Sequence, residues 1–179
     1  MIILMFAIDS GIQEEHRFLS KAIDKSSSHC YLPGLNDTSD QVNNGGHGTR
    51  VAGAILYPNG IPAVSKYKLP CWIQNARVLD DRNSLPDVLF PPNLLRSIVK
   101  RYFSDSEEKT RIYNHSIAAF YPCRLQHMSS WAAEMDNLSF ENDVLFIQAA
   151  GNIHDDSPGP IRLGIKQHLV AGRGYPGYL

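Results

Sequence analysis

Residues 2–12 have the sequence IILMFAIDSGI, and this stretch decides the fold class of the chain. Residues 2–8 are apolar without polar alternation, which is typical of a strand covered on both faces, as in a parallel sheet. The run then stops at Asp9, Ser10 and Gly11, residue types that favour a turn. The stretch therefore predicts a buried parallel strand with polar groups at its carboxyl end.

Strands and helices alternate along the rest of the sequence. Apolar runs predict further strands at 72–79, 111–118 and 144–150 and a short piece at 168–171, and helical patterns lie at 48–56, 92–103 and 128–138. The first of these helices is rich in small residues that would let it pack close to a sheet, and the second begins at a Pro-Pro pair. This alternation predicts an open, mostly parallel α/β sheet.

Size and composition predict one ordinary globular domain over residues 1–179. The chain is long enough for one sizeable core. Its composition, with 43% hydrophobic and 20% charged residues, excludes a disordered or nucleic-acid-coating protein. With a net charge of −1, neither nucleic acid nor membrane is expected as a partner. Neither a G-x-G-x-x-G motif nor a P-loop lysine follows the first strand, which argues against nucleotide binding.

The opening apolar run is too short to cross a bilayer, and it lacks the basic leader and cleavage site of a secretory signal. We therefore expect a cytoplasmic protein. Cys30, Cys71 and Cys123 are odd in number and widely spaced, so we expect reduced, partly buried thiols. The histidines other than His47 show no metal-ligand spacing, and a structural role is expected for each: His16, His29, His115, His127, His154 and His168.

Four polar residues lie where the predicted sheet would gather them. Asp9, Ser116 and Asn152 follow three of the strands, and His47 directly precedes the helix at 48–56. Because the carboxyl ends of parallel strands and helix N-termini face a shared crevice, we expect these residues at one edge. A carboxylate beside an imidazole fixes the ring tautomer and stabilises the imidazolium, and an amide donates to a developing oxyanion.

Each of these residues has a plainer interpretation when it is taken alone. Asp9 fits a turn or cap after a strand, His47 fits an exposed loop, and Asn152 fits a turn after glycine. Ser116 fits a backbone contributor better than a chemical one, and Ser10 fits a cap or a hydrogen-bond partner of Asp9. Only the occurrence of three motifs in one order favours a catalytic interpretation.

The three motifs are AIDSGI at residues 7–12, GHGTRVAG at 46–53 and AAGN at 149–152. They resemble, in order, the aspartate, histidine and oxyanion-asparagine motifs of the subtilisin-like serine proteases, or subtilases. The resemblance implies a three-layer, subtilisin-like α/β fold with helices on both faces of the sheet. It also implies peptide-bond hydrolysis in which His47 is the general base, Asp9 orients it and Asn152 donates to the oxyanion.

The same resemblance implies how a substrate binds. Residues 114–118, NHSIA, look like the family's cleft strand, so Ser116, Ile117 and Ala118 would shape the pocket of a peptide or protein substrate. No cofactor is required by this chemistry, and calcium would act only as a structural stabiliser without an assignable site. Arg50 and His115 depart from the family pattern, and these departures bear on the substrate preference more than on the family.

The family's nucleophile is missing from this sequence. Subtilases carry it in a later G-T-S-x-A or G-T-S-x-S motif that does not occur here, and Ser157, the only serine after Asn152, precedes Pro158 in a loop. Since an acid and a base without a nucleophile cannot form an acyl-enzyme, we expect a domain without its C-terminal part that is inactive alone. Its apolar edge and face would be exposed, and its partner would be a C-terminal fragment bearing the serine. The alternative function is a catalytically inert peptide-binding module.

Overall fold

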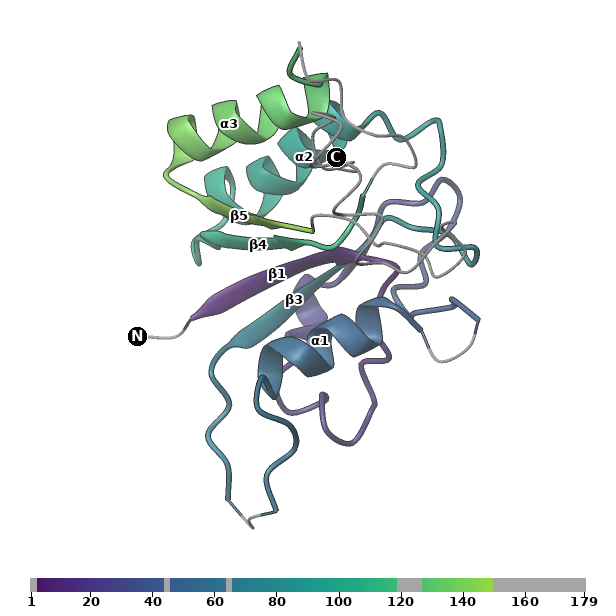
Figure 1. Ribbon diagram of the computed structural model, residues 1–179, viewed down its shortest axis with the longest axis vertical. Helices are drawn as coiled ribbons and strands as arrows, with labels where there is room; N and C mark the ends of the chain where they lie inside the picture. The colour runs from purple at the N-terminus through teal and green to yellow at the C-terminus, as the bar shows by residue number, and fades with distance from the viewer. Residues whose placement is uncertain (1–2, 44–45, 64–65, 119–126, 150–179) are drawn as a thin grey trace, which may run out of the picture.

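A single sheet organises the computed structural model, which describes residues 3–43, 46–63, 66–118 and 127–149. Within these ranges the sheet has five parallel strands in the order β2-β3-β1-β4-β5 (Figure 1). The strands are β1 (Leu4–Asp9), β2 (His29–Cys30), β3 (Trp72–Arg77), β4 (Ile112–His115) and β5 (Leu145–Gln148). Because all neighbouring pairs are parallel, the carboxyl ends of the strands lie along one edge.

β1 is the central strand because its side chains are apolar on both faces. It pairs with β3 over its whole length and with β4 from Met5 to Ile8. Phe6 and Ile8 belong to one hydrophobic core and Ala7 to the other, as the alternation of side chains along a strand requires. All three side chains are fully buried, so the apolar run forms a strand covered on both faces, as predicted.

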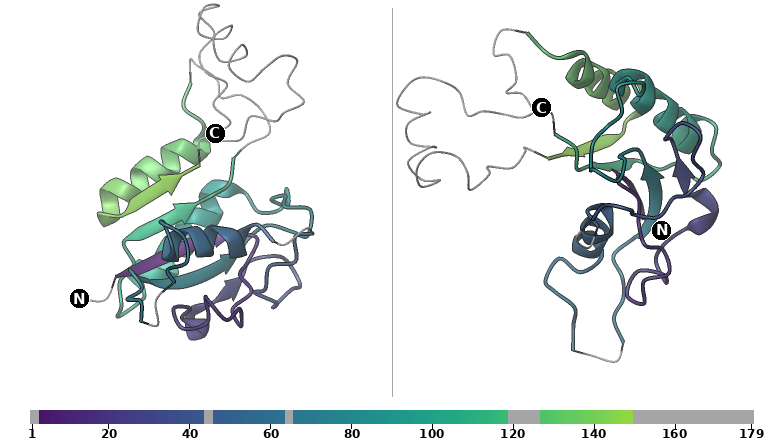
Figure 2. Two further views of the ribbon diagram at one scale, coloured as in Figure 1. Left: turned by 60° about the horizontal axis from the view of Figure 1, so that its bottom comes forward. Right: turned by 90° about the vertical axis from the view of Figure 1, so that its right-hand side faces the viewer.

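Helices cover both faces of this sheet (Figures 1 and 2). α1 (Gly48–Leu56) lies on one face, and α2 (Pro91–Val99) and α3 (Ser130–Asn142) lie side by side on the other. α2 continues into a π-helical turn, η2 (Lys100–Ser104), and a 3-10 helix, η1 (Lys25–Ser27), precedes β2. The predicted three-layer α/β fold is therefore confirmed. In the part of the chain that the structure describes, no helix is long and apolar enough to cross a membrane.

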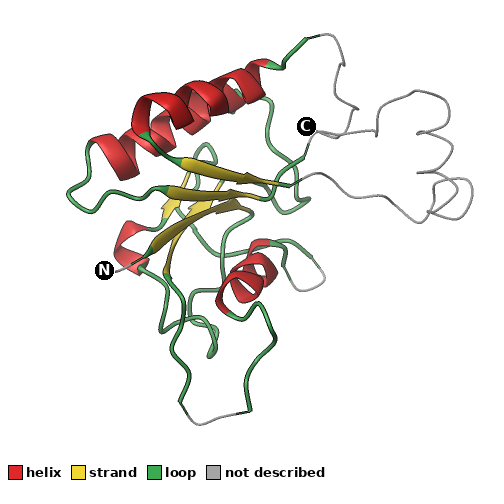
Figure 3. Ribbon diagram, turned by 60° about the vertical axis from the view of Figure 1, so that its left-hand side comes forward, coloured by secondary structure: helices red, strands yellow, loops and turns green. Residues whose placement is uncertain are grey.

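Several observed elements differ from the predicted ones (Figure 3): η1 was not predicted, the helix predicted at 128–138 runs from 130 to 142, and the strand predicted at 111–118 ends at His115. The helix predicted at 92–103 is α-helical only to Val99, and beyond that residue it widens into η2. β2 was not predicted, since a two-residue strand has no periodicity and exists only through its pairing with β3. Cys30 and Cys71 are buried free thiols, as expected. Cys123 and the apolar piece at 168–171 lie outside the described residues.

One apolar part of the sheet is not covered by any described residue. Phe146 of β5 packs against the core beneath α2 and α3, so its neighbours Leu145 and Ile147 point to the opposite face. α1 lies over that face at β1, whereas Leu145 and Ile147 are 57% and 44% exposed. The exposed apolar face expected from the sequence is present at β5.

Truncation of Ile98 tests the core beneath α2 and α3. Ile98 is fully buried on α2, so Ile98→Ala removes transfer energy and leaves a cavity. We expect the free energy of unfolding to fall by about 2–5 kcal/mol in urea denaturation. The matched control is Ile61→Ala, at a side chain that is 56% exposed, which should change it by less than about 0.5 kcal/mol. Equal effects of the two substitutions would contradict this assignment of the core.

Candidate active site

Asp9 ends β1 and is held in place through its backbone and its side chain. Its backbone carbonyl accepts hydrogen bonds from the N–H groups of Val78 (2.8 Å) and Leu79 (3.3 Å), just beyond β3. Its carboxylate Oδ1 accepts from the backbone N–H of Ser10 at 2.7 Å, and the side chain is 1% exposed. A carboxylate buried this deeply needs hydrogen-bond donors, and the turn after β1 supplies one of them.

His47 reaches the same carboxylate from the start of α1. Its Nδ1 lies 2.7 Å from Asp9 Oδ1, while its side chain stays 35% exposed. Because the carboxylate accepts, Nδ1–H is the donor, and the neutral ring keeps its lone pair on Nε2. The pair is therefore arranged as an imidazole base with a fixed tautomer and partial access to solvent.

Two glycines allow the start of α1 to come this close to the turn after β1. A Cβ on Gly48 would lie 2.2 Å from the carbonyl oxygen of Gly11, a distance that no side chain tolerates, and 3.0 Å from Asp9 Cβ, which is a tight contact. Gly11 has a φ of +97°, and a Cβ there would lie 2.5 Å from the carbonyl oxygen of Thr38. The glycines of the sequence motifs thus permit the approach of His47 to Asp9.

Ser10 joins the carboxylate to the helix. Its hydroxyl lies 3.2 Å from Asp9 Oδ1 and 3.0 Å from Asp40 Oδ1, and it accepts from the backbone N–H of Gly48 at 2.9 Å. The side chain is fully buried. Ser10 is the capping and hydrogen-bonding residue that the sequence predicted, and it is not placed to attack a substrate.

The surroundings of His47 raise its pKa above the ordinary value of 6.5. The hydrogen bond with Asp9 is the main cause of the increase. The charges of Asp9 and Asp40 also raise the pKa, whereas burial and the charge of Arg50 lower it. A base must be neutral, so any reaction that uses His47 as its base declines as the pH falls through this pKa. The raised pKa of His47 also stabilises the folded state. This contribution is complete below the unfolded-state pKa and is lost as the pH rises through the folded-state pKa.

The predicted substrate residues follow β4 at the same edge of the sheet. Ile8 pairs with His115, so Asp9 and Ser116 come directly after a register pair of neighbouring strands. Ser116 Oγ accepts from Asn114 Nδ2 at 2.8 Å. The side chain of Ile117 is 8% exposed and belongs to the core beneath α2 and α3, so it does not project freely from this edge.

His115 is a core residue, in line with the structural role expected for it. It is 1% exposed and meets Trp131 edge to face, with ring centroids 5.0 Å apart. Burial lowers the pKa of His115 to about 4, against an opposing hydrogen bond with Gln148, so its ring is neutral at neutral pH.

Sequence reasoning missed Asp40. This carboxylate is 4% exposed and accepts hydrogen bonds from Ser10 Oγ and from the backbone N–H groups of Val42 (3.2 Å) and Thr49 (2.9 Å). No local signal distinguishes it, because aspartate is common in a polar loop such as residues 26–46.

The other predicted features add no group to this site. Asn152, the predicted oxyanion donor, lies outside the described residues. Within the described ranges, no group of three or more His, Cys, Asp or Glu side chains is arranged to hold a metal ion. A cavity of about 780 Å³ lies beside α1 and is lined by Phe18, Tyr57 and Ile61 among others, but His47 does not line it.

Adding a methyl group at Gly48 tests the close approach of α1 to β1. Gly48→Ala forces the Gly11 carbonyl and α1 apart, and we expect a loss of about 1–3 kcal/mol in the free energy of unfolding. Gly53→Ala is the matched control on the same helix: its Cβ would meet nothing within 4 Å, and alanine should stabilise the helix by about 0.5–1 kcal/mol. Urea denaturation measures both, and a Gly48→Ala protein as stable as wild type would contradict the packing described.

Titration of His47 tests the electrostatics of the pair. We expect the pKa of His47, measured by NMR on labelled imidazoles and assigned with His47→Gln, to lie above 6.5. Asp9→Asn should lower it, because the variant removes the negative charge and leaves only a neutral amide oxygen as the acceptor, which favours the imidazolium less. Glu107→Gln, which removes one negative charge at an exposed position, should leave it unchanged. A His47 pKa that does not respond to Asp9→Asn would overturn the pairing.

Known structures share this fold. The serine protease of Aeromonas sobria in complex with the chaperone has 21% sequence identity and a TM-score of 0.57, over 84% of this chain and 25% of that chain. A cold-adapted subtilisin-like serine proteinase has 22% identity and a TM-score of 0.57, over 84% of this chain and 46% of that one. A lanthipeptide protease has 20% identity and a TM-score of 0.54, over 84% and 39% of the two chains. At this level of identity the likeness establishes the fold, and this chain spans less than half the length of these proteins.

The solved structures show the fold, and a comparison of sequences shows the family. No curated protein sequence matches the chain. The profile described as the subtilase family, however, matches residues 7–176. Since this match includes both the Asp9 and the His47 motifs and nearly the whole sequence, the chain belongs to the subtilase family.

Proposed function

We propose that this chain is the part of a subtilisin-like serine endopeptidase that carries the acid and the base of the catalytic triad. The observation that carries the proposal is the 2.7 Å hydrogen bond between His47 Nδ1 and Asp9 Oδ1. In a subtilase, that bond supports His47 as the general base and Asp9 as the residue that orients it. The reaction is hydrolysis of peptide bonds in a peptide or protein substrate.

In this proposal a serine outside residues 1–179 is the nucleophile. Its hydroxyl gives a proton to His47 Nε2 while its oxygen attacks the substrate carbonyl carbon, and Asp9 stabilises the imidazolium that forms. The amide of Asn152 donates to the oxyanion of the tetrahedral intermediate. His47 then gives the proton to the leaving amine, and water, activated by His47, hydrolyses the acyl-enzyme.

The 179-residue chain by itself is inactive under this proposal. Ser10, the serine next to the pair, is buried, and its hydroxyl is engaged with Asp40 and with the N–H of Gly48. No G-T-S-x-A or G-T-S-x-S motif occurs in the sequence. An acid and a base alone exchange protons but form no acyl-enzyme.

The uncovered face at β5 supports a partner segment that brings the serine. Leu145 and Ile147 expose more than two fifths of their surface there, on the edge strand of the described sheet. Complete burial of such side chains contributes about 1.5–3 kcal/mol each. Because the two side chains are already about half buried, a C-terminal segment or a separate fragment would gain about half of this energy by covering the face and extending the sheet beyond β5.

The residues after β4 support binding of an extended peptide. Ser116 and Ala118 are partly exposed, and they follow His115, the last residue of β4. A substrate would add to this stretch through backbone hydrogen bonds, as in strand addition. The buried side chain of Ile117 would then form the floor of the pocket. Its carbonyl oxygen is already held by Gln148 Nε2 at 2.6 Å, so it would not pair with the peptide.

A fluorophosphonate probe, which reacts with activated serines, tests the proposal directly. We expect it to label the native protein that includes the serine-bearing segment and not to label residues 1–179 alone. His47→Gln in the native protein should abolish labelling because the serine loses its base, whereas Glu107→Gln should not change it.

Labelling of residues 1–179 alone would contradict the assignment of the nucleophile to another segment. A native protein that binds peptides in calorimetric titration but is not labelled would contradict the proposed activity and favour the inert peptide-binding module.

A further inference from the structure

The side chain of the N-cap residue His47 does not cap the N-terminus of α1. The first N–H groups of a helix lack partners within it, and the side chain of the N-cap residue usually accepts from one of them. His47 occupies the N-cap position of α1, but its side chain makes no capping hydrogen bond. Its Nδ1 is directed to Asp9 instead.

Two residues from other segments take over the capping. Gly48 N–H donates to Ser10 Oγ at 2.9 Å, and Thr49 N–H donates to Asp40 Oδ2 at 2.9 Å. The two caps are linked, because the Ser10 hydroxyl lies 3.0 Å from Asp40 Oδ1. The negative charge of Asp40 also lies at the positive end of the helix dipole.

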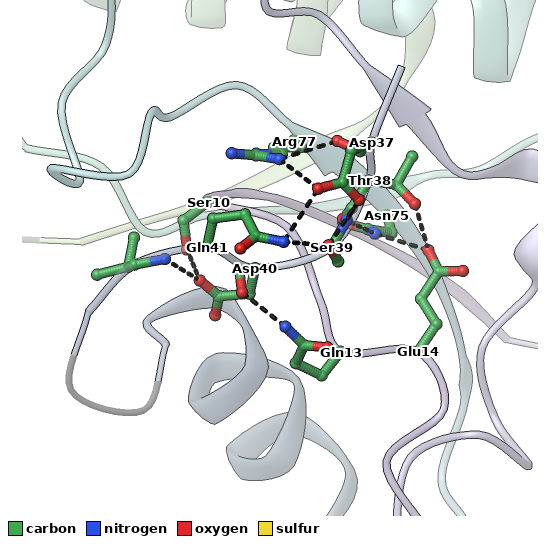
Figure 4. A network of polar contacts seen from close by, with 11 residues as sticks. Ser10, Gln13, Glu14, Asp37, Thr38, Ser39, Asp40, Gln41, Asn75 and Arg77 are labelled. Atoms are coloured by element: carbon green, nitrogen blue, oxygen red, sulfur yellow. Dashed lines mark hydrogen bonds and ion pairs between the residues drawn. The ribbon is translucent and has the colours of Figure 1, made fainter. Parts of the chain in front are cut away.

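Asp40 is itself held firmly in its loop (Figure 4). Its Oδ1 accepts from the N–H of Val42 at 3.2 Å, and its backbone carbonyl accepts from Gln13 Nε2 at 2.7 Å. Gly46 has a φ of +72°, and a Cβ there would lie 2.2 Å from Asp40 Oδ2. The backbone next to His47 therefore lies directly against the Asp40 carboxylate, which leaves room only for glycine.

We propose that Asp40 is a positioning residue for the Asp9 and His47 pair, acting through Ser10 and the N-terminus of α1. Asp40 binds the helix that carries His47 and, through the Ser10 hydroxyl, the turn that carries Asp9. It thereby fixes the two segments whose separation sets the 2.7 Å contact. The inference rests on the proposed function in one respect, namely that His47 acts as the base.

The electrostatics of His47 provide a readout of this role. Asp9 and Asp40 raise the pKa of His47, and Arg50 and burial lower it. The charge of Asp40 raises the pKa of His47 by itself, so a positioning role is separated from this effect by a variant that keeps both carboxylates. A carboxylate that places His47 against Asp9 affects the titration through its own charge and through the geometry of the pair.

The test is the titration of His47 by NMR in the intact 179-residue chain carrying Asp40→Asn. We expect the pKa of His47 to fall relative to wild type, but by less than in Asp9→Asn, because Asp9 is the direct partner. The matched control is Asp136→Asn on α3, which removes the same charge at an exposed position and should leave the pKa unchanged. A folded Asp40→Asn chain with the wild-type His47 pKa would overturn the proposal.

Ser10→Ala keeps the proposal testable if Asp40→Asn does not fold. This variant leaves both carboxylates in place and removes only the hydroxyl that connects them. We expect a lower His47 pKa and faster amide exchange at Gly48, and an unchanged His47 pKa in the folded variant would also overturn the proposal. Neither measurement depends on proteolysis, so a failed fluorophosphonate experiment and a failed positioning role are distinguishable.

Discussion

The hydrogen bond between Asp9 and His47 is the interaction on which the site depends, and it joins residues 38 positions apart in the sequence. One partner ends the central strand of the sheet, and the other stands at the start of α1. β1 cannot shift without disturbing the two cores that it separates, so the carboxylate has a fixed position. The imidazole is therefore brought to a rigid acceptor, which fixes its tautomer.

Two buried carboxylates lie beside one helix start, and the local backbone provides several of their hydrogen-bond donors. Ser10 N–H donates to Asp9, and Val42 N–H and Thr49 N–H donate to Asp40. These bonds require backbone segments to lie closer together than side chains permit, which explains the glycines at positions 11, 46 and 48. The motif around His47 thus serves both packing and chemistry.

The helices cover the two faces of the sheet unequally. α2 and α3 cover one face of the sheet as far as β5, whereas α1 covers the other face at β1. Leu145 and Ile147 remain exposed on the α1 side. The same parallel arrangement that brings Asp9 and Ser116 to one edge also places these exposed apolar side chains on β5, the last strand of the described sheet.

The sequence alone determined the layered fold and the identity of the central pair, because a continuous apolar run, small residues around His47 and the order of the motifs are local patterns. It did not reveal β2, Asp40 or the buried position of Ile117. A two-residue strand exists only through its partner, Asp40 acquires its role from donors on segments before and after it, and the residues after β4 acquire their burial from α3. Only the tertiary structure decided these features, because hydrogen bonds and burial between distant segments leave no periodicity in the sequence.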